Sequence, residues 1–396
     1  MVSKLASIAR KRERLILGLM SGTSLDGLDL ALCQIKGSGE QTQLQINHFK
    51  TITYSAQVRA DIQEIFSKPT VNMAKLSAMH ARIGTLFAEC TLLALNEWEI
   101  NPSAIDLIAS HGQTIYHAPQ SLTHDFHYPN STFQIGDGDH IAVKTGIITL
   151  SDFRQKHVAA GGEGAPLVVY GDRLLFSPKT GSRILLNIGG IANFTYLPAV
   201  DASDDLLLAS DTGPGNTLMN QYMQHELDEP FDKDGALAAS GKVNSNVLAA
   251  LLNHPFFSAA LPKTTGPELF NLAYIEKTLQ QTRLSAPTHA DMMATLTMFT
   301  AKSIAHGIQA LNVHSLIDEI YVSGGGVHNH FLMHCLKETL PSCSIHRFDA
   351  LGIPADAKEA VLFAVLANET VAGTADHMNG GVAAPQVCLG KISFPQ

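Results

Sequence analysis

Residues 15–30 read LILGLMSGTSLDGLDL: an apolar run, a turn of small polar residues and a second, alternating run. An apolar strand, a turn rich in Gly, Ser and Thr, and another strand predict a β-hairpin. Small turn residues let backbone N–H groups approach a bound anion, and hydroxyl groups can donate to it. Asp26 and Asp29 would repel a bare phosphate but suit a phosphate that arrives with a divalent cation. The loop therefore favours a metal–nucleotide, with an ordinary polar hairpin as the alternative.

The bulk composition restricts the class of protein. The chain has 396 residues, enough for two domains with full cores. Hydrophobic residues make up 45% and charged residues 16% of the chain, so we expect a compact globular protein. The net charge of −9 argues against a nucleic-acid partner, because no basic run offsets it.

The cysteines and the N-terminal segment indicate a cytoplasmic protein without a membrane partner. Five dispersed cysteines with no CxxC spacing fit reduced, buried thiols. A basic stretch over residues 4–14 precedes the apolar residues 15–20, which imitates a signal peptide. Six apolar residues are too few for one and no small-residue cleavage site follows, so we expect a frayed basic tail. No apolar run reaches the ~20 residues of a membrane helix.

The first half of the chain continues as strands and helices. We expect a third strand at 44–54, a helical tract at 55–99, a buried strand at 105–110 that ends in SHGQT, a strand and turn at 133–137, a helix at 141–145 and a strand at 147–150 that ends in SDFR. Residues 159–166, with three glycines and a proline, have the composition of a hinge.

The second half repeats this layout from about residue 183. A strand, a Gly-rich turn and a strand cover 184–196, and a strand at 206–210 runs into DTGPGN; helical patterns follow at 217–226, 236–252 and 289–311, then a strand at 320–322 that ends in SGGG, a helix at 355–368 and one possible strand near Val387. Two units that each open with a hairpin suggest a duplicated α/β fold. Ligands favour domain interfaces, so we expect an active-site cleft between the halves.

Ten motifs in order carry a family resemblance. They are SGTSLDG, HGQT, DFR, GGEGAP, NIGGIAN, DTGPGN, DKDG, PKTTGPELF, SGGG and the KEA of a late helix. The set, spread over about residues 15 to 375, resembles the anhydro-N-acetylmuramic acid kinase family of the sugar-kinase, actin and heat-shock-chaperone superfamily. The resemblance implies a two-domain, ribonuclease H-like fold, with domain I at 1–161 plus 376–396 and domain II at 162–375.

The resemblance also implies a reaction. An ATP- and Mg²⁺-dependent kinase would act on 1,6-anhydro-N-acetylmuramic acid in peptidoglycan recycling. Water would open the internal 1,6 ether at the anomeric carbon while the freed O6 takes the γ-phosphoryl group, giving N-acetylmuramate 6-phosphate and ADP. The family further implies a cytoplasmic homodimer.

Two carboxylates are the expected catalytic residues. Asp211 follows a predicted strand, and a carboxylate can take a proton from water that attacks an anomeric carbon. From the residues alone it could instead shape an Asx turn. Glu359 is carried over from the family, although Asp356-Ala357 departs from the aromatic residue often found before it. Its alternative is a solvated charge on a helix face.

The nucleotide is expected to lie against three loops. The predicted nucleotide-binding residues are Gly22, Thr23, Ser24, Leu25, Asp26, Gly27, Leu28 and Asp29 in the first hairpin, Gly189, Gly190 and Asn193 in the second, and Gly324, Gly325, Gly326 and Asn329 in the SGGG segment. Asp26 would hold Mg²⁺ directly or through water, since charge neutralisation and alignment supply most phosphoryl-transfer catalysis. A plain tight turn or a helix-start loop is the alternative for the second and third sets.

The predicted sugar-binding residues are His111, Gln113, Thr114 and Arg154. Arg154 suits a carboxylate through a charge-assisted fork, or else forms a structural ion pair. A histidine after a buried strand is more often a core residue, so the resemblance decides the assignment of His111. A metal site is another interpretation of four nearby histidines, but their spacing matches no standard zinc pattern: His111, His117, His124 and His127.

Other classes remain open from the residues. One is a kinase of the same superfamily for another small sugar or carboxylate. Two differences from the family pattern bear on this alternative: Glu163 stands where the family usually has an uncharged polar residue, and residues 169–172 also differ from many members. Another is a non-enzymatic nucleotide switch. We expect closure of the two domains around residues 160–164 when both substrates bind.

Overall fold

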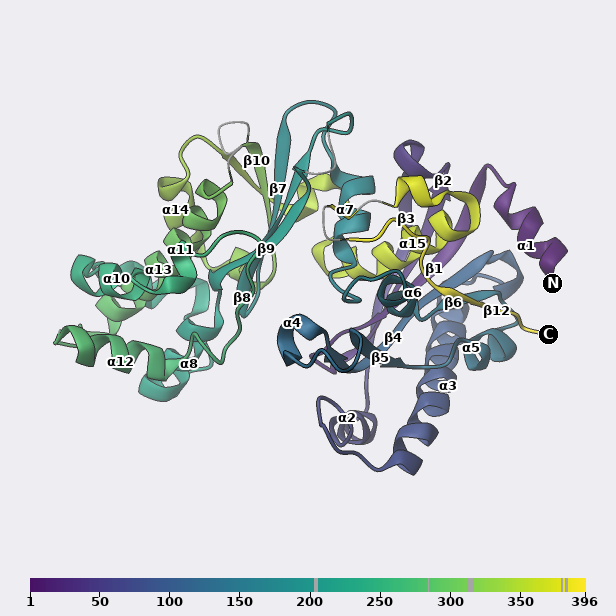
Figure 1. Ribbon diagram of the computed structural model, residues 1–396, viewed down its shortest axis with the longest axis horizontal. Coiled ribbons are helices and arrows are strands. Elements are labelled where there is room, and N and C mark those ends of the chain that lie inside the picture. The colour runs from purple at the N-terminus through teal and green to yellow at the C-terminus, as the bar shows by residue number, and fades with distance from the viewer. Residues whose placement is uncertain (203–205, 284, 312–316, 379, 382–383) are drawn as a thin grey trace. The chain divides into compact units, whose positions relative to one another are not determined.

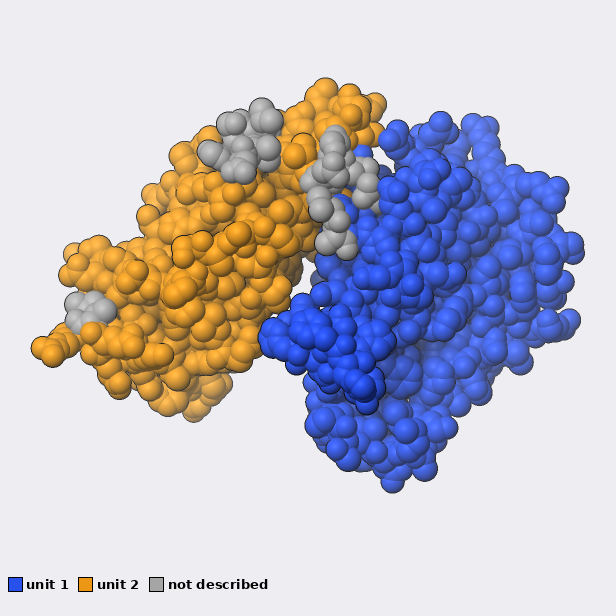
Figure 2. Space-filling model, in the orientation of Figure 1, with its two compact units in different colours: residues 1–176, 356–396 blue, residues 177–355 orange. Residues whose placement is uncertain are grey.

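The computed structural model describes residues 1–202, 206–283, 285–311, 317–378, 380–381 and 384–396. The chain forms two compact units (Figure 2): unit 1 comprises residues 1–176 and 356–396, and unit 2 comprises residues 177–355. Unit 2 is therefore one continuous stretch of chain, whereas unit 1 is built from both ends of the sequence.

Unit 1 contains a mixed sheet with helices on its faces (Figure 1). Its elements are α1 (Val2–Ala9), β1 (Glu13–Ser21), β2 (Gly27–Lys36), β3 (Gln43–Thr53), α2 (Ala56–Gln63), α3 (Met73–Glu97), β4 (Leu107–Ala118), α4 (Gln120–Thr123), β5 (Ser131–Ile135), α5 (Gly138–Thr145), β6 (Thr149–Ser151), α6 (Phe153–Ala159), α7 (Val168–Phe176), α15 (Lys358–Ala372) and β12 (Lys391–Ser393). The order across the sheet is β12-β6-β4-β1-β2-β3, and β5 pairs with β4 outside this path.

The opening hairpin is the centre of this sheet. β1 and β2 are antiparallel, with Leu17 opposite Leu32, and both residues are buried, as alternation of apolar residues predicts. β1 runs parallel to β4 on its other side. Two elements distant in sequence then complete the packing. α3 places Met79, Ile83 and Phe87 in the core of unit 1, as predicted from their helical spacing, and α15 packs against β1.

Unit 2 contains a smaller sheet and a group of helices. Its elements are β7 (Ser182–Ile188), β8 (Ile191–Pro198), β9 (Leu208–Pro214), α8 (Thr217–Leu227), α9 (Ala236–Ser240), α10 (Ser245–Leu252), α11 (Pro255–Ser258), α12 (Leu272–Thr282), α13 (His289–Gln309), β10 (Ile317–Ser323), α14 (His330–Thr339) and β11 (Ser344–Arg347). The order across the sheet is β11-β10-β7-β8-β9. α13 is the main core helix, and the predicted core residues Leu296, Phe299, Ile304 and Ile308 are buried in it.

The two sheets share one topology. In each unit, three antiparallel strands are followed by two strands parallel to the first: β3-β2-β1-β4-β6 in unit 1 and β9-β8-β7-β10-β11 in unit 2. The predicted duplication of an α/β fold is confirmed by this repeat.

The structure differs from the predicted domain ranges in the place of two helices. The sequence assigned residues 162–176 and 356–375 to the second domain, but α7 and α15 belong to unit 1. The reason is close packing of α15 on β1: a Cβ atom at Gly18 would lie 1.9 Å from the carbonyl oxygen of Ala360. Only a residue without a side chain allows this approach, and the contact joins positions far apart in sequence.

Five local predictions were also wrong. The expected frayed tail forms α1, whose Ile8 is buried, so its apolar side is held by tertiary packing. β4 continues through His111 to Ala118, and β9 continues through Asp211 to Pro214, so both motifs lie inside strands. The expected helix at 236–252 is divided after Ser240 into α9 and α10. The last strand is β12, beyond Val387.

The remaining global features concern thiols and membranes. All five cysteines are free. Within the described ranges, no helix has the length and apolar character needed to cross a membrane.

Candidate active site

The base of the first predicted phosphate loop is fixed by buried hydrogen bonds. Ser21, the last residue of β1, donates to Oε1 of Gln113 at 2.5 Å and accepts from the hydroxyl of Tyr54 at 2.7 Å. The Gln113 amide nitrogen in turn donates to the carbonyl of Gly22 at 3.2 Å. Gln113 is fully buried, and in this structure its side chain stabilises the loop through these hydrogen bonds. Tyr54 was not predicted, because only the fold brings the end of β3 to this position.

The loop itself presents polar groups to solvent. Thr23, Ser24 and Asp26 are exposed, and the Ser24 hydroxyl donates to Asp26 at 2.8 Å. Leu25 and Leu28 are buried in the core of unit 1. Only the backbone groups of these two leucines could therefore face a nucleotide, while their side chains anchor the loop.

The carboxylates of this loop fit a shared magnesium ion. Asp29 is half-buried and accepts from the Thr51 hydroxyl at 2.5 Å. Burial raises the pKa of Asp29, the Thr51 hydrogen bond opposes this, and the charges of Asp26 and Asp356 raise it further. Among described residues, no cluster of three or more His, Cys, Asp or Glu could hold a metal alone. The donors instead suit Mg²⁺, which protein carboxylates share with phosphate oxygens and water.

A second group in unit 1 joins Arg154, His111 and Glu359. Arg154 in α6 donates from Nε to Nε2 of His111 at 2.8 Å and from a terminal nitrogen to the carbonyl of Gly164 at 2.7 Å. Burial lowers the pKa of Arg154 to about 10, while Glu359 acts in the opposite direction. The side chain of Glu359 is solvent-accessible, but much of its surroundings is protein. The resulting loss of hydration raises the pKa of Glu359, whereas the charges of Arg154 and Lys358 lower it.

The geometry fixes the proton of His111. Its Nδ1 lies 2.9 Å from the carbonyl oxygen of Gly112, which can only accept, so Nδ1 carries the hydrogen. Nε2 is then free to accept from Arg154. Burial lowers the pKa of His111 well below its ordinary value, and the charge of Arg154 lowers it further. His111 is therefore a neutral ring that orients Arg154, which the sequence could not reveal.

The start of α15 is anchored beside Glu359. Nζ of Lys358 lies 2.9 Å and 3.1 Å from the two carboxylate oxygens of Asp172 in α7. The Asp172 side chain is 2% exposed, so the pair is shielded from water. Asp172 lies in the segment 169–172, which departs from the family pattern, and its ion pair with Lys358 was not predicted.

In unit 2, Asp211 is held by a loop from the PKTTGPELF motif. The backbone N–H of Thr265 donates to Oδ2 of Asp211 at 2.8 Å, and the N–H of Asp211 donates to the carbonyl of Lys263 at 3.0 Å. Burial raises the pKa of Asp211, the Thr265 hydrogen bond opposes this, and the charge of Glu268 raises it. A carboxylate with a raised pKa, one oxygen of which accepts a backbone hydrogen bond, is suited to take up a proton. Asn193 of the second hairpin lies opposite Asp211 in the β8–β9 register.

The turn of the second hairpin is in close backbone contact with the DTGPGN segment. The N–H groups of Gly215 and Asn216 donate to the carbonyls of Gly190 and Gly189 at 2.9 Å and 2.8 Å. A Cβ atom at Gly215 would lie 2.3 Å from the oxygen of Gly189, so the two loops interlock. The Gly189–Gly190 turn is thus joined to the DTGPGN segment.

The SGGG segment borders a cavity in unit 2 of about 360 Å³. The lining residues are Asn216, Met219, Asn220, Phe231, Asp232, Asp234, Gly325, His328 and Asn329. Two of them, Gly325 and Asn329, were predicted to contact adenosine. Asn329 also caps α14 by accepting from the N–H of Leu332 at 2.9 Å. Mixed apolar and amide side chains of this kind suit a flat heteroaromatic ring with a polar edge.

The other predicted residues are placed as follows. Thr114 is half-buried in β4 and accepts from the Gln134 amide at 3.2 Å. The histidine-based metal reading finds no support among residues with described positions, where no metal-binding group of three is present; His124 and His127 are exposed.

The repeated five-strand order, with glycine-rich hairpins and half-buried carboxylates, defines the class: a two-unit α/β protein with a duplicated mixed-sheet topology. A family model described as anhydro-N-acetylmuramic acid kinase matches residues 14–395. The chain therefore belongs to the anhydro-N-acetylmuramic acid kinase family and is a kinase.

Known proteins of this name are similar over their whole length. One from Pseudoalteromonas translucida is 47% identical, with 99% of this chain and 98% of the relative covered. One from Caldanaerobacter subterraneus is 40% identical, with 99% and 100% covered. Among solved structures, the activator of the 2-hydroxyisocaproyl-CoA dehydratase from Clostridium difficile with bound ADPNP is similar with a TM-score of 0.40 and 10% identity, covering 90% of this chain and 95% of that one.

Proposed function

We propose that the protein uses ATP to open the 1,6-anhydro bond of 1,6-anhydro-N-acetylmuramic acid and to phosphorylate O6. The products are N-acetylmuramate 6-phosphate and ADP. Family membership supports the sugar, and one observation supports the chemistry: Asp211 has a raised pKa and its Oδ2 is held by the Thr265 N–H. Among described residues none donates to Oδ1, which leaves this oxygen for a water molecule.

The proposed roles follow from charge and geometry. Asp211 takes a proton as water attacks the anomeric carbon, and the ether oxygen O6 leaves that carbon and attacks the γ-phosphorus. Glu359 accepts a hydrogen bond from the sugar or the water. Arg154, preoriented by His111, forms charge-assisted bonds with the lactyl carboxylate.

We assign phosphate contacts to the glycine-rich loop of each hairpin. Backbone N–H groups of residues 22–27 and of Gly189 and Gly190 face the phosphates, and the cavity beside Gly325 holds the adenosine. Asp26, with Asp29 nearby, holds Mg²⁺, which neutralises phosphate charge when bound. Peptidoglycan recycling, a cytoplasmic location and a homodimer complete the proposal, on the resemblance to the family.

The test follows both new bonds. The protein is incubated with Mg–ATP and the anhydro-sugar in ¹⁸O water, and the product is analysed by mass spectrometry. One solvent oxygen at C1 and one phosphate are expected. The Asp211→Asn variant should bind nucleotide but lose at least about a thousandfold in turnover. Glu276→Gln, at an exposed position of α12, is the matched control, and it should behave like wild type.

Two results would count against the proposal. Normal turnover by Asp211→Asn would remove the base assignment. Equal phosphorylation of the reducing sugar N-acetylmuramic acid, without solvent oxygen, would favour the alternative of an ordinary sugar kinase, for which Glu163 near the hinge is the departure in this chain.

A further inference from the structure

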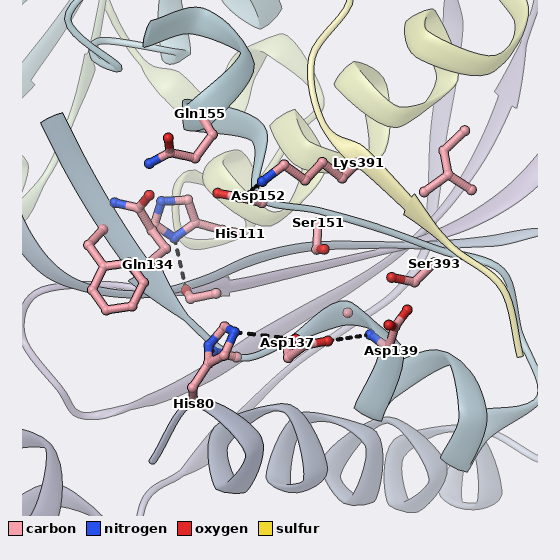
Figure 3. Close-up of a pocket in the computed structure, with 15 residues that line it drawn as sticks. His80, His111, Gln134, Asp137, Asp139, Ser151, Asp152, Gln155, Lys391 and Ser393 are labelled. Carbon is pink, nitrogen blue, oxygen red and sulfur yellow. Dashed lines mark hydrogen bonds and ion pairs between the residues drawn. The ribbon is translucent and has the colours of Figure 1, made fainter. Parts of the chain in front are cut away.

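Unit 1 contains a second cavity, of about 520 Å³, where β4 changes partners (Figure 3). Residues 108–110 of β4 pair with β6, and residues 113–118 pair with β5. Gly112 lies between the two segments with φ +78°, a conformation that a side chain disfavours. β5 and β6 separate at this point, beyond the carboxyl end of β6 and beside the start of α5. Ligands of open α/β sheets commonly bind where neighbouring strands diverge in this way.

One residue of the cavity lining carries a buried, unpaired amide oxygen. Gln134 of β5 lines it and is 7% exposed. Its amide nitrogen donates to the hydroxyls of Thr114 and Thr132 at 3.2 Å and 2.8 Å. Its Oε1 has no partner among the residues that the structure describes, although the atom is buried. A buried acceptor without a donor costs about 1–3 kcal/mol, so a ligand that donates here would be stabilised.

The charges of the cavity disfavour an anion. One lysine is present and it is paired: Lys391 forms an ion pair with Asp152, while Nε2 of His80 lies 3.3 Å from Asp137 (Figure 3). Asp139, also in the lining, is exposed and adds a further negative charge. The balance of three carboxylates against one lysine favours neutral or positively charged groups.

The remaining lining suits a small polyhydroxylated ring. Ser151, Ser393 and Gln155 supply hydroxyl and amide groups from three elements, and Phe133 presents a ring that is 39% exposed. Figure 3 shows the labelled polar side chains on several sides of the same space. One apolar surface surrounded by hydrogen-bonding groups is the usual composition of a site for small polar ligands.

We propose that this cavity is a second ligand site, which binds a small sugar that is neutral or carries an amine and excludes sugars that carry a carboxylate. The site shares only His111 with the residues assigned to the anhydro-sugar. Because His111 lines the cavity and accepts from Arg154, an occupant alters how Arg154 is held, and this link alone rests on the proposed function.

The binding test uses the full-length protein without nucleotide. N-acetylglucosamine, glucosamine and N-acetylmuramate are titrated separately by calorimetry and by ligand-observed NMR. The first two sugars should bind in a Gln134-dependent way, and Gln134→Leu should weaken both by about fivefold, as expected for one lost hydrogen bond. Gln63→Leu, on the exposed side of α2, is the matched control and should not change binding. N-acetylmuramate should show no Gln134-dependent binding.

A second variant separates charge from folding. Asp139→Asn lies at the exposed start of α5, and should weaken glucosamine by about threefold while leaving N-acetylglucosamine unchanged. If Gln134→Leu does not fold, this selective loss decides the question. Equal affinities in wild type and both variants, or no binding of either sugar, would overturn the proposal and leave a cavity filled with water.

The link to catalysis has its own readout. N-acetylglucosamine should change the KM for the anhydro-sugar in wild type but not in Gln134→Leu. A Gln134-dependent binding signal without any turnover would instead count against the proposed function, so the two failures are distinguishable.

Discussion

Replacement of His111 by Phe should weaken sugar binding while leaving the fold intact. The change removes the acceptor of the 2.8 Å bond from Arg154 Nε, and the guanidinium keeps its bond to the Gly164 carbonyl. The phenyl ring should fit, since His111 already packs against Phe363 with a centroid distance of 4.8 Å. A hydrogen bond to a charged group contributes about 1.5–3 kcal/mol, and about 1.4 kcal/mol is tenfold in an equilibrium constant. We therefore expect a KM for the anhydro-sugar that is raised roughly ten- to a hundredfold.

The assay is steady-state ADP release at saturating Mg–ATP, with thermal unfolding measured in parallel. A matched substrate control is 1,6-anhydro-N-acetylglucosamine, which lacks the lactyl carboxylate that Arg154 is proposed to bind. The variant should lose its defect with this sugar, because both enzymes then lack the same interaction. An unchanged KM for the muramic sugar, or an equal rise with both sugars, would refute the role of His111 in positioning Arg154.

Three further predictions concern stability. Gly18→Ala should lower the unfolding free energy by at least about 2 kcal/mol in denaturant titrations, because the new Cβ atom meets the carbonyl of Ala360 at 1.9 Å; a wild-type midpoint would contradict this packing. Asp172→Asn should lower it by about 3 kcal/mol by leaving Lys358 without its buried anion, and a loss below about 0.5 kcal/mol would show that the pair is not needed. Burial lowers the pKa of His157 to about 4, so the unfolded chain binds the extra proton first as pH falls. Stability should therefore fall by up to about 3 kcal/mol between pH 6.5 and 4, and a His157→Gln variant with the same pH dependence would exclude this source.

The local pattern predicted the hairpins and the core helices well. Leu17 and Leu32 face the core because strand alternation alone determines their side, and Phe87 and Phe299 are buried because helical spacing determines theirs. These features depend on neighbours within a few residues, which a single sequence displays directly.

Features that depend on distant contacts were missed. The strand through His111 is longer than its apolar run because β5 pairs with polar residues of β4, which have no hydrophobic period. The membership of α15 in unit 1 depends on the contact of Gly18 with Ala360. The site residues Tyr54 and Gln134 carry no sequence signal, and the PKTTGPELF motif does not show that Thr265 binds Asp211, since each acts through a partner brought by the fold.

The return of the chain to unit 1 after residue 355 has a consequence for biosynthesis. While a ribosome is still making unit 2, the sheet of unit 1 has neither α15 over β1 nor β12 beside β6. Unit 2 is contiguous and can reach its final state first, whereas the N-terminal half must wait with an uncovered apolar face. Nascent chains stalled just before residue 356 should consequently recruit chaperones through the opening strands, which are among the first residues made, rather than through the newest segment.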